Sequence, residues 1–411
     1  MEYKREYKKY ITASVLDTAN NKIASSTFIT AFAVYLGLST FAIGIYSVLD
    51  TITNIIQIFA APIFSKIGQS KFVVLLNYSI YRLASVCFAF IPFISDYISI
   101  RTTLFFIFAS IYAITGELGY VLFVNWRMTL LRKEDRTKFT ATRNIFKNTI
   151  VVAFSLLMGV ILDYYTKNGN ELYGFLILFT LVFIIAFADI FIRIKTFKPN
   201  LEMQSVSIKE TISIPAKDKR FRKVLIITSL FIFADWMKKI YLNVYLLRYL
   251  NVSYLYYSIL NIIINLSDAI ISKYWSSKVK DRKWLKILIP SSVLNVTALI
   301  LLLIGNRILI YILPLIYILF GLGSSAYEIF DSVAVYENSK EKYQTSYITF
   351  ERFIEGIIVS ILPILSLALP KDNIEGIKIT FIISIIAFII LTMYLVRKNK
   401  TTVKEEKADA K

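Results

Sequence analysis

Apolar runs of about twenty residues recur along the whole chain, and no other feature of the sequence restricts the fold so strongly. A run of this length crosses the hydrocarbon core of a bilayer as an α-helix. Inside lipid the backbone must satisfy its own hydrogen bonds, so these runs fit helices rather than the shorter alternating segments of a membrane barrel. The chain has 411 residues, 56% of them hydrophobic, and is therefore predicted to be an all-α polytopic membrane protein.

Twelve transmembrane helices are predicted, and the polar connector 195–222 divides them into two halves of six. The connector is too short to be a soluble domain. The predicted organisation is an N-terminal six-helix bundle over 1–194, a C-terminal six-helix bundle over 223–396 and a basic and acidic cytoplasmic tail over 397–411. The first apolar run has no small-residue cleavage site, so we expect a helix rather than a removable signal peptide. The predicted spans are 10–36, 39–65, 71–95, 102–129, 145–165, 172–194, 223–249, 254–276, 286–304, 308–335, 347–369 and 377–396.

Basic residues gather on one side of these spans. The net charge is +19, and the two termini, the connector and the loops RKEDRTK and SKVKDRK carry much of it. The turns on the opposite side hold few basic residues. The positive-inside rule therefore predicts a multi-pass protein of the cell membrane with both termini in the cytoplasm. Orientation and contact with lipid headgroups account for the charge, so we expect the lipid bilayer and no nucleic acid as a partner.

The sequence has no histidine, and Cys87 is its single cysteine. Disulfides within the chain, His-ligated metals and imidazole proton relays are thereby excluded, so a coupling proton must be carried by Asp or Glu. The chain contains no P-loop, no dinucleotide-binding glycine motif and no nucleophile elbow. We therefore expect no enzymatic activity, no cofactor and no bound metal, with a coupling proton or sodium ion as the one exception.

The chain repeats itself between its halves. The stretch YSVLDTITNIIQ at 46–57 returns as YSILNIIINLSD at 257–268, and steps of four, four and three place the matched polar residues on one helical face. Three further pairs follow in the same order: SKIGQSK with SKVKDRK, IYAITG with IYILFG, and FTATRNIF with ITFERFIE. Because six is an even number, the two halves share one orientation. The residues matched in the first pair are Tyr46, Asp50, Asn54 and Gln57 with Tyr257, Asn261, Asn265 and Asp268.

Twelve helices, a central connector and paired halves resemble the plan of the major facilitator superfamily over essentially the whole chain. The loop motif of that superfamily is matched in part by APIFSKIGQSK, where Lys66, Gly68 and Lys71 fit. The Gly-rich antiporter signature with its Gly-Pro pair is absent from VVAFSLLMGVILD. The segment RTKFTATRN, which contains Arg143, is similar to an Arg-containing loop of a divergent bacterial branch.

The resemblance implies that helices 1, 4, 7 and 10 line a central cavity, and most of the predicted intramembrane charges fall on these helices or on those flanking them. A charge at mid-bilayer costs at least about 2.5 to 3.5 kcal/mol, so it needs a partner or water. The expected solute-binding or ion-binding residues are Lys22, Asp50, Asn54, Glu117, Asp235, Lys238, Lys239, Asn261, Asn265 and Asp268. The residues expected in gating or structural charge pairs are Asp17, Arg82, Arg143, Glu328, Asp331, Arg352 and Glu355.

Two of these expectations concern particular pairs. Arg82 is expected to neutralise a carboxylate on a neighbouring helix, with Asp50 as the candidate. Asp235 lies three and four residues before Lys238 and Lys239. This spacing lets Asp235 pair with either lysine and leaves the other cation for a solute.

The leading interpretation is a secondary active transporter that moves a small organic solute by alternating access, as a monomer, in proton-coupled export by antiport. Glu117, beside Gly116 and Gly119, is the first candidate for the proton-exchanging carboxyl, and Asp50 and Asp268 are the alternatives. Lys239 or Lys238, together with Lys22, would bind an anionic or zwitterionic group of the solute. The alternative is a sodium-coupled or proton-coupled uptake symporter of a sugar, nucleoside or peptide-like solute. A non-transporting membrane scaffold is the third interpretation.

Overall fold

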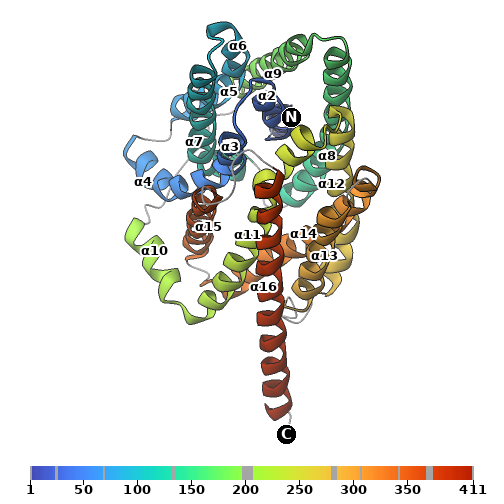
Figure 1. Ribbon diagram of the computed structural model, residues 1–411. Coiled ribbons are helices and arrows are strands. Elements are labelled where there is room, and N and C mark those ends of the chain that lie inside the picture. The colour runs from blue at the N-terminus through green and yellow to red at the C-terminus, as the bar shows by residue number, and fades with distance from the viewer. Residues whose placement is uncertain are drawn as a thin grey trace. The chain divides into compact units, whose positions relative to one another are not determined.

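In a computed structural model of the protein, the described residues lie almost entirely in helices (Figure 1). No β-strand occurs among the residues that the structure describes. The described residues are 2–23, 26–67, 70–130, 135–196, 207–278, 285–305, 308–340, 343–366 and 374–409.

The chain divides into two compact units. Unit 1 is Met1–Ile208 with Ser253–Ser258, and unit 2 is Lys209–Val252 with Ile259–Lys411. The bundle limits anticipated above, with a separate connector over 195–222, stay a prediction. The helices of unit 1 are α1 (Glu2–Ile23), α2 (Ser26–Tyr35), α3 (Thr40–Ile52), α4 (Gln57–Ile67), α5 (Lys71–Cys87), α6 (Ile91–Ile94), α7 (Ile98–Leu130), α8 (Asp135–Lys167) and α9 (Glu171–Ile194).

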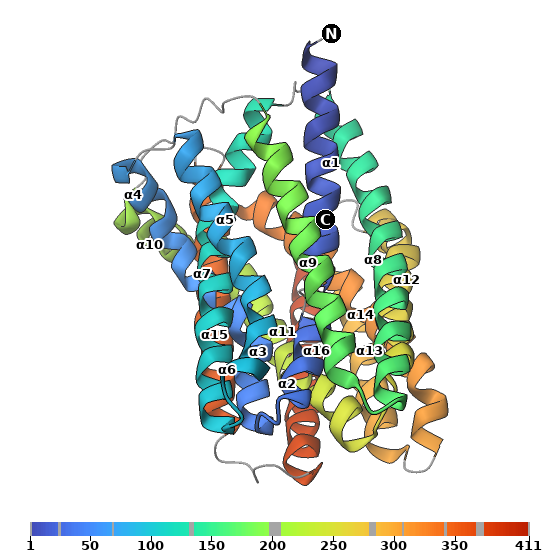
Figure 2. The same ribbon diagram turned by 90° about the horizontal axis from the view of Figure 1, so that it is seen from above.

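In unit 1, α1 packs against α8 and α9, and α5 packs against α7 and α9 (Figure 2). Aromatic side chains fill the contact between α2 and α9. The ring of Phe32 meets Phe175 and Phe179 edge to face, at centroid distances of 5.1 and 4.9 Å. All three side chains are almost fully buried, so this part of unit 1 has a close-packed apolar core.

In unit 2, α13 packs against α14 and α16, and α11 packs against α15 and α16 (Figure 1). The helix α12 approaches α14 at Gly321, where an added Cβ would lie 2.5 Å from the carbonyl oxygen of Ile264. Only glycine allows this approach. The helices are α10 (Ile208–Lys217), α11 (Lys219–Val244), α12 (Tyr254–Lys278), α13 (Leu285–Ile304), α14 (Leu309–Asn338), α15 (Gln344–Ser366) and α16 (Ile374–Asp409), and the first turn of α12 is counted with unit 1.

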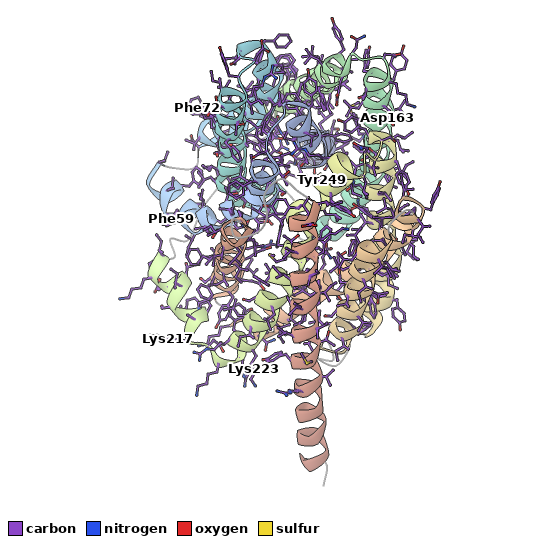
Figure 3. The ribbon with its side chains drawn as sticks, viewed as in Figure 1. Phe59, Phe72, Asp163, Lys217, Lys223 and Tyr249 are labelled. Carbon is purple, nitrogen blue, oxygen red and sulfur yellow. The ribbon has the colours of Figure 1, made fainter. Side chains whose placement is uncertain are left out.

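Eight helical segments of the described residues are long and apolar enough to cross a membrane. Their outer faces carry large exposed apolar side chains, among them Phe72, Phe187 and Ile270 with exposed fractions of 71, 65 and 76%. Figure 3 labels Phe72 and another such residue, Phe59. Lipid is the solvent that suits such a surface. The structure thus supports a multi-pass helical membrane protein, whereas the count of twelve spans stays a prediction.

The polar face predicted for the second span is interrupted. The α-helix α3 ends at Ile52, and a 3-10 turn over Thr53–Ile56 leads into α4. A 3-10 turn has three residues per turn, so the even steps from Tyr46 to Gln57 do not form one continuous α-helical face. The matching stretch 257–268 lies wholly within the α-helix α12.

Asp218 caps the start of α11. Its carboxylate accepts hydrogen bonds from the backbone N–H groups of Arg220 and Phe221, at 2.9 and 3.4 Å, and from the Tyr347 hydroxyl of α15, at 2.7 Å. Burial raises the pKa of Asp218, but these hydrogen bonds outweigh burial and leave its pKa below the ordinary value. A lowered pKa means that the carboxylate stabilises the fold above about pH 4 and that this stabilisation is lost as the pH falls through the folded-state value.

We expect Asp218→Ala to destabilise unit 2 by about 0.5 to 2 kcal/mol at neutral pH, because the first turn of α11 loses its cap. Thermal unfolding of the purified protein in detergent measures the effect. The difference from wild type should shrink at acidic pH, where the wild-type carboxyl is protonated as well. Lys217→Ala, a change at the exposed neighbouring residue, is the control and should leave the midpoint unchanged at both pH values.

Candidate functional site

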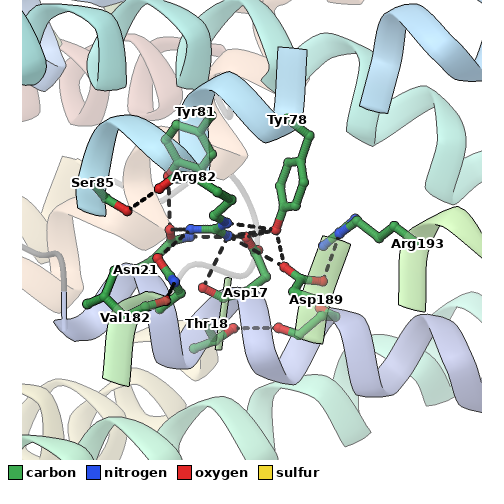
Figure 4. Close-up of polar contacts among 12 residues, drawn as sticks. Asp17, Thr18, Asn21, Tyr78, Tyr81, Arg82, Ser85, Val182, Asp189 and Arg193 are labelled. Carbon is green, nitrogen blue, oxygen red and sulfur yellow. Dashed lines mark hydrogen bonds and ion pairs between the residues drawn. The ribbon is translucent and has the colours of Figure 1, made fainter. Parts of the chain in front are cut away.

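A buried cluster of charges, which we name cluster N, lies inside unit 1 (Figure 4). At its centre the Arg82 side chain of α5 has no exposed surface. The guanidinium forms an ion pair with Asp17 of α1 and lies 3.8 Å from the carboxylate of Asp189 on α9. Asp189 also pairs with Arg193 at 2.9 Å. Two cations and two carboxylates therefore balance each other in the interior of unit 1.

Hydrogen bonds satisfy the remaining donors of Arg82. Its Nη1 donates to the side-chain oxygens of Asn20 and Asn21, at 3.0 and 2.7 Å, and its Nε donates to the Tyr78 hydroxyl at 2.9 Å. The Tyr78 hydroxyl in turn donates to Asp189. A buried guanidinium is stable only when its fork of donors is satisfied in this way, so cluster N ties α1, α5 and α9 together.

The expected pairing of Arg82 with Asp50 is wrong. Asp50 is an exposed residue of α3, which packs mainly against α2 and α7, and it takes no part in the ion pairs that Arg82 forms among the described residues. The carboxylates that reach Arg82 come from α1 and α9. Asp189, Asn20, Asn21 and Tyr78 were absent from the predicted site.

A second buried cluster, cluster C, lies inside unit 2 on α11. Asp235 is 6% exposed, and its two carboxylate oxygens lie 2.6 Å from the Lys238 ammonium and 2.5 Å from the Lys239 ammonium. Lys238 is 3% exposed and also donates to the Asn295 side chain of α13. Its ammonium lies 4.4 Å from the centroid of the Phe320 ring. By contrast, 44% of the Lys239 side chain is exposed.

The two clusters share one construction. The sequence DTANNK begins at Asp17 and DWMKKI begins at Asp235, and in each the third and fourth residues after the aspartate are polar: Asn20 and Asn21 in the first, Lys238 and Lys239 in the second. In unit 1 the asparagine is on α1 and the cation, Arg82, is on α5. In unit 2 the cation, Lys238, is on α11 and the asparagine, Asn295, is on α13.

Glu117 contacts the helix that follows the 3-10 turn. Its carboxylate accepts a hydrogen bond of 2.7 Å from the side-chain amide of Gln57, which joins α7 to α4. The neighbouring Gly116 lies against Tyr81 of α5, where an added Cβ would come within 2.9 Å of the ring. Asn54 is buried near the same turn.

The polar residues of α12 are only partly enclosed. Asn265 is exposed, and its side-chain amide donates to the carbonyl oxygen of Asn261 at 2.5 Å. Asp268 is half-buried, and its carbonyl oxygen accepts a hydrogen bond of 3.3 Å from the Ser325 hydroxyl of α14. These residues therefore contact their own helix and α14.

Acidic residues gather where α14 meets α15. Arg352 and Glu355, both on α15, form an ion pair of 3.2 Å, and Glu328 is an exposed residue of α14. Asp331 of α14 is hydrogen-bonded to Glu351 of α15. Glu351 was not among the predicted residues, although Arg352 and Glu355 of the same helix were.

Among the predicted loop-motif residues Lys66, Gly68 and Lys71, only Lys71 has a described side chain. Its ammonium donates to the carbonyl oxygens of Ile194 and Thr196, at 2.5 and 2.6 Å, and so caps the end of α9. No group of three or more acidic or cysteine side chains in the described part of the chain could hold a metal ion. The side chains of Lys22, Lys66 and Arg143, and all of Gly68, lie outside the described residues.

The shared construction of the clusters predicts that the cation of cluster N can be moved. Arg82→Asn alone should destabilise unit 1 by about 3 to 5 kcal/mol, because Asp17 and Asp189 lose their buried partner. Adding Asn20→Lys recreates the arrangement of cluster C and should restore most of the loss. Thermal unfolding in detergent compares the two variants, with Asn20→Lys alone as the control. A double variant no more stable than Arg82→Asn would refute the equivalence of the clusters.

The family model described as the Major Facilitator Superfamily matches residues 11–363. Solved structures of similar fold include a bacterial homologue of the iron transporter ferroportin in an inward-facing state, with a TM-score of 0.75 and 12% identity, covering 96% of this chain and 98% of the other. No match was found among curated protein sequences.

Two further solved structures share the fold. A mutant of the nucleoside transporter NupG has a TM-score of 0.74 and 13% identity, covering 95% of this chain and 99% of the other. A POT family transporter in complex with a thioalcohol-conjugated peptide has a TM-score of 0.69 and 13% identity, covering 96% of each chain. At these identities the likeness concerns the fold, whereas the family model spans most of the sequence. The chain belongs to the Major Facilitator Superfamily.

Proposed function

We propose that this protein is a monomeric, proton-coupled secondary active transporter of the cell membrane, with both termini in the cytoplasm. It moves a small organic solute that carries an anionic group, by alternating access. Membership of the superfamily supports transport of a small solute in general. The charge pattern of α11 supports the chemical class of the solute.

The observation that carries this proposal is the unequal burial of two adjacent lysines. Lys238 is enclosed by Asp235, Asn295 and the Phe320 ring, so its charge is neutralised by groups inside unit 2. Lys239 shares the same carboxylate but has 44% of its side chain exposed. A partly exposed ammonium on a helix of this kind needs water or a solute anion. Lys239 is therefore the better of the two predicted solute-binding lysines.

Trp236 adds an aromatic surface beside this cation. The Lys239 ammonium lies 5.4 Å from the centroid of the Trp236 ring. A carboxylate could bind the ammonium while an apolar part of the solute rests on the indole. This combination suits a small organic acid or a zwitterion better than a neutral sugar.

Alternating access requires that each half moves as a rigid body. Cluster N joins α1, α5 and α9 within unit 1, and cluster C joins α11 and α13 within unit 2. Because buried ion pairs are costly to separate, each cluster resists deformation of its own unit. The clusters thus support rocking of intact halves over bending of single helices.

Two directions of transport are candidates. Export in exchange for protons is the interpretation favoured by the sequence. Uptake together with protons is the second candidate, and it is favoured by the cationic Lys239 and by the likeness to a peptide-bound POT family transporter. A peptide-like zwitterion carries the carboxylate that Lys239 would bind, whereas an uncharged nucleoside does not.

Transport is tested by charge movement on solid-supported membranes that carry the reconstituted protein. Pools of amino acids, dipeptides, nucleosides and organic acids are applied at several pH values, with and without sodium. We expect pH-dependent currents from pools of anionic or zwitterionic compounds. Currents that depend on sodium would identify sodium, rather than the proton, as the coupling ion. If no pool produces current or tracer flux with folded protein, transport is refuted.

Lys239→Ala should raise the half-saturating solute concentration about tenfold to a hundredfold, because the solute loses a charge-assisted hydrogen bond. Lys239→Arg keeps the charge and should retain most of the affinity. Lys223→Ala, at an exposed lysine nearer the start of α11 (Figure 3), is the matched control and should behave as wild type. If Lys239→Ala binds the solute with unchanged affinity, the anionic group of the solute is bound by another residue.

A further inference from the structure

Two carboxyl groups face each other between α14 and α15. Glu351 is 6% exposed and is hydrogen-bonded to Asp331. Its Oε1 atom is buried and has no hydrogen-bond donor among the described residues. Among the described residues, the hydrogen-bond partner of this buried carboxyl is thus a second carboxyl.

A hydrogen bond between two carboxyl groups requires a proton. An ionised carboxylate only accepts hydrogen bonds, so two ionised groups in contact have nothing to donate and repel each other. When one group is protonated, its O–H donates to the other, and the pair carries a single negative charge. Pairs that share one proton in this way are established acid–base devices in other proteins.

The charged neighbours of the pair lie on α14, α15 and α11. On α15, Arg352 is the adjacent cation, but it is bound to Glu355 at 3.2 Å and its side chain is 48% exposed. On α14, Tyr327 stacks on Phe231 at a centroid distance of 3.9 Å. From α11, Trp236 is hydrogen-bonded to Glu355, and Lys239 lies in the field of Glu355 and Glu328. No cation of the described residues forms an ion pair with Glu351 within 4.0 Å.

We propose that Asp331 and Glu351 hold the coupling proton of this transporter and that the proton binds together with an anionic solute at Lys239. This inference rests on the proposed function for the solute and on the geometry of α14 and α15 for the proton. It assigns the proton to unit 2, in place of the sequence-based candidate Glu117, whose carboxylate is bonded to the Gln57 amide.

Glu355 connects the proton to the solute. It lies in the field of Arg352, of Asp331 and of Lys239. Release of the proton to water changes the pair from one negative charge to two, which draws Arg352 toward the pair and away from Glu355. Glu355 is then left to neutralise Lys239, and the bound solute anion loses its partner. The protonated pair keeps Glu355 with Arg352 and leaves Lys239 to the solute.

The sign of this coupling selects between the two directions of transport. A proton and a solute anion that strengthen each other's binding travel together, which is co-transport. An inward proton gradient would then drive uptake. Exchange would require the opposite sign, in which the proton displaces the solute.

Infrared spectroscopy of the reconstituted protein in H₂O and D₂O tests the pair directly, with the proton itself as the probe. Wild type should show the carbonyl band of a protonated, hydrogen-bonded carboxyl that shifts in D₂O. The band should be lost in Glu351→Gln and in Asp331→Asn. It should persist in Glu337→Gln, which changes an exposed carboxyl of the same α14 and is the matched control. A band unchanged in both pair variants overturns the proposal.

Transport assays with the same four solute pools test the coupling. Glu351→Gln can still donate to Asp331, so it imitates a permanently protonated pair. It should lose pH-driven accumulation while solute counterflow remains within about twofold of wild type. Accumulation that survives in Glu351→Gln and is lost in Glu117→Gln overturns the assignment. Absence of transport by the wild type refutes the proposed function instead, which keeps the two failures distinct.

If Glu351→Gln does not fold, Asp331→Asn carries both measurements, because it neutralises the other member of the pair. The change in bound protons when the solute binds gives the sign of the coupling. A pH indicator in weakly buffered detergent solution measures this change. Uptake of protons on addition of the active pool supports co-transport. Release of protons overturns it.

Discussion

The enclosure of Arg82 sets the condition on which unit 1 depends. A guanidinium with no exposed surface requires carboxylates and acceptors around it, and these come from α1 and α9. The position of α5 against α9 is therefore fixed by charge as well as by apolar packing. Without Asp17 and Asp189 the same apolar helices could slide along one another, because lipid tails are as apolar as their side chains.

In unit 2 the need to neutralise a buried cation has a different outcome. Burial encloses Lys238 and leaves Lys239 partly exposed, although both pair with the one carboxylate of Asp235. Adjacent residues of a helix point about 100° apart, so a single step along α11 separates an interior cation from one that can meet a solute. Three charges on one helix thus serve two purposes, and Asp235 supports both.

The sequence allowed the helical class, the family and the short-range pairing of Asp235 to be predicted, because apolar length and i,i+3 or i,i+4 spacing are properties of single helices. Partners on different helices were not predictable from one chain. Asp50 was chosen for Arg82 although α3 packs mainly on α2 and α7, and Asp189 was overlooked on α9. Glu351 was overlooked although Arg352 and Glu355 of the same helix were predicted. The 3-10 turn after Ile52 leaves no pattern of its own in the apolar sequence.

The shared construction of the clusters explains why only one of them suits a solute. In cluster N the residue at the fourth position after the aspartate is Asn21, a neutral group whose oxygen accepts from Arg82 and Tyr81. In cluster C the same position is Lys239, and moving the interior cation onto α11 places a second positive charge beside it. Relocation of one charge between neighbouring helices therefore turns a closed structural network into one with an accessible cation. The acidic residues of α14 and α15 lie in the unit that carries this accessible cation, where a change in their protonation can reach it through Glu355.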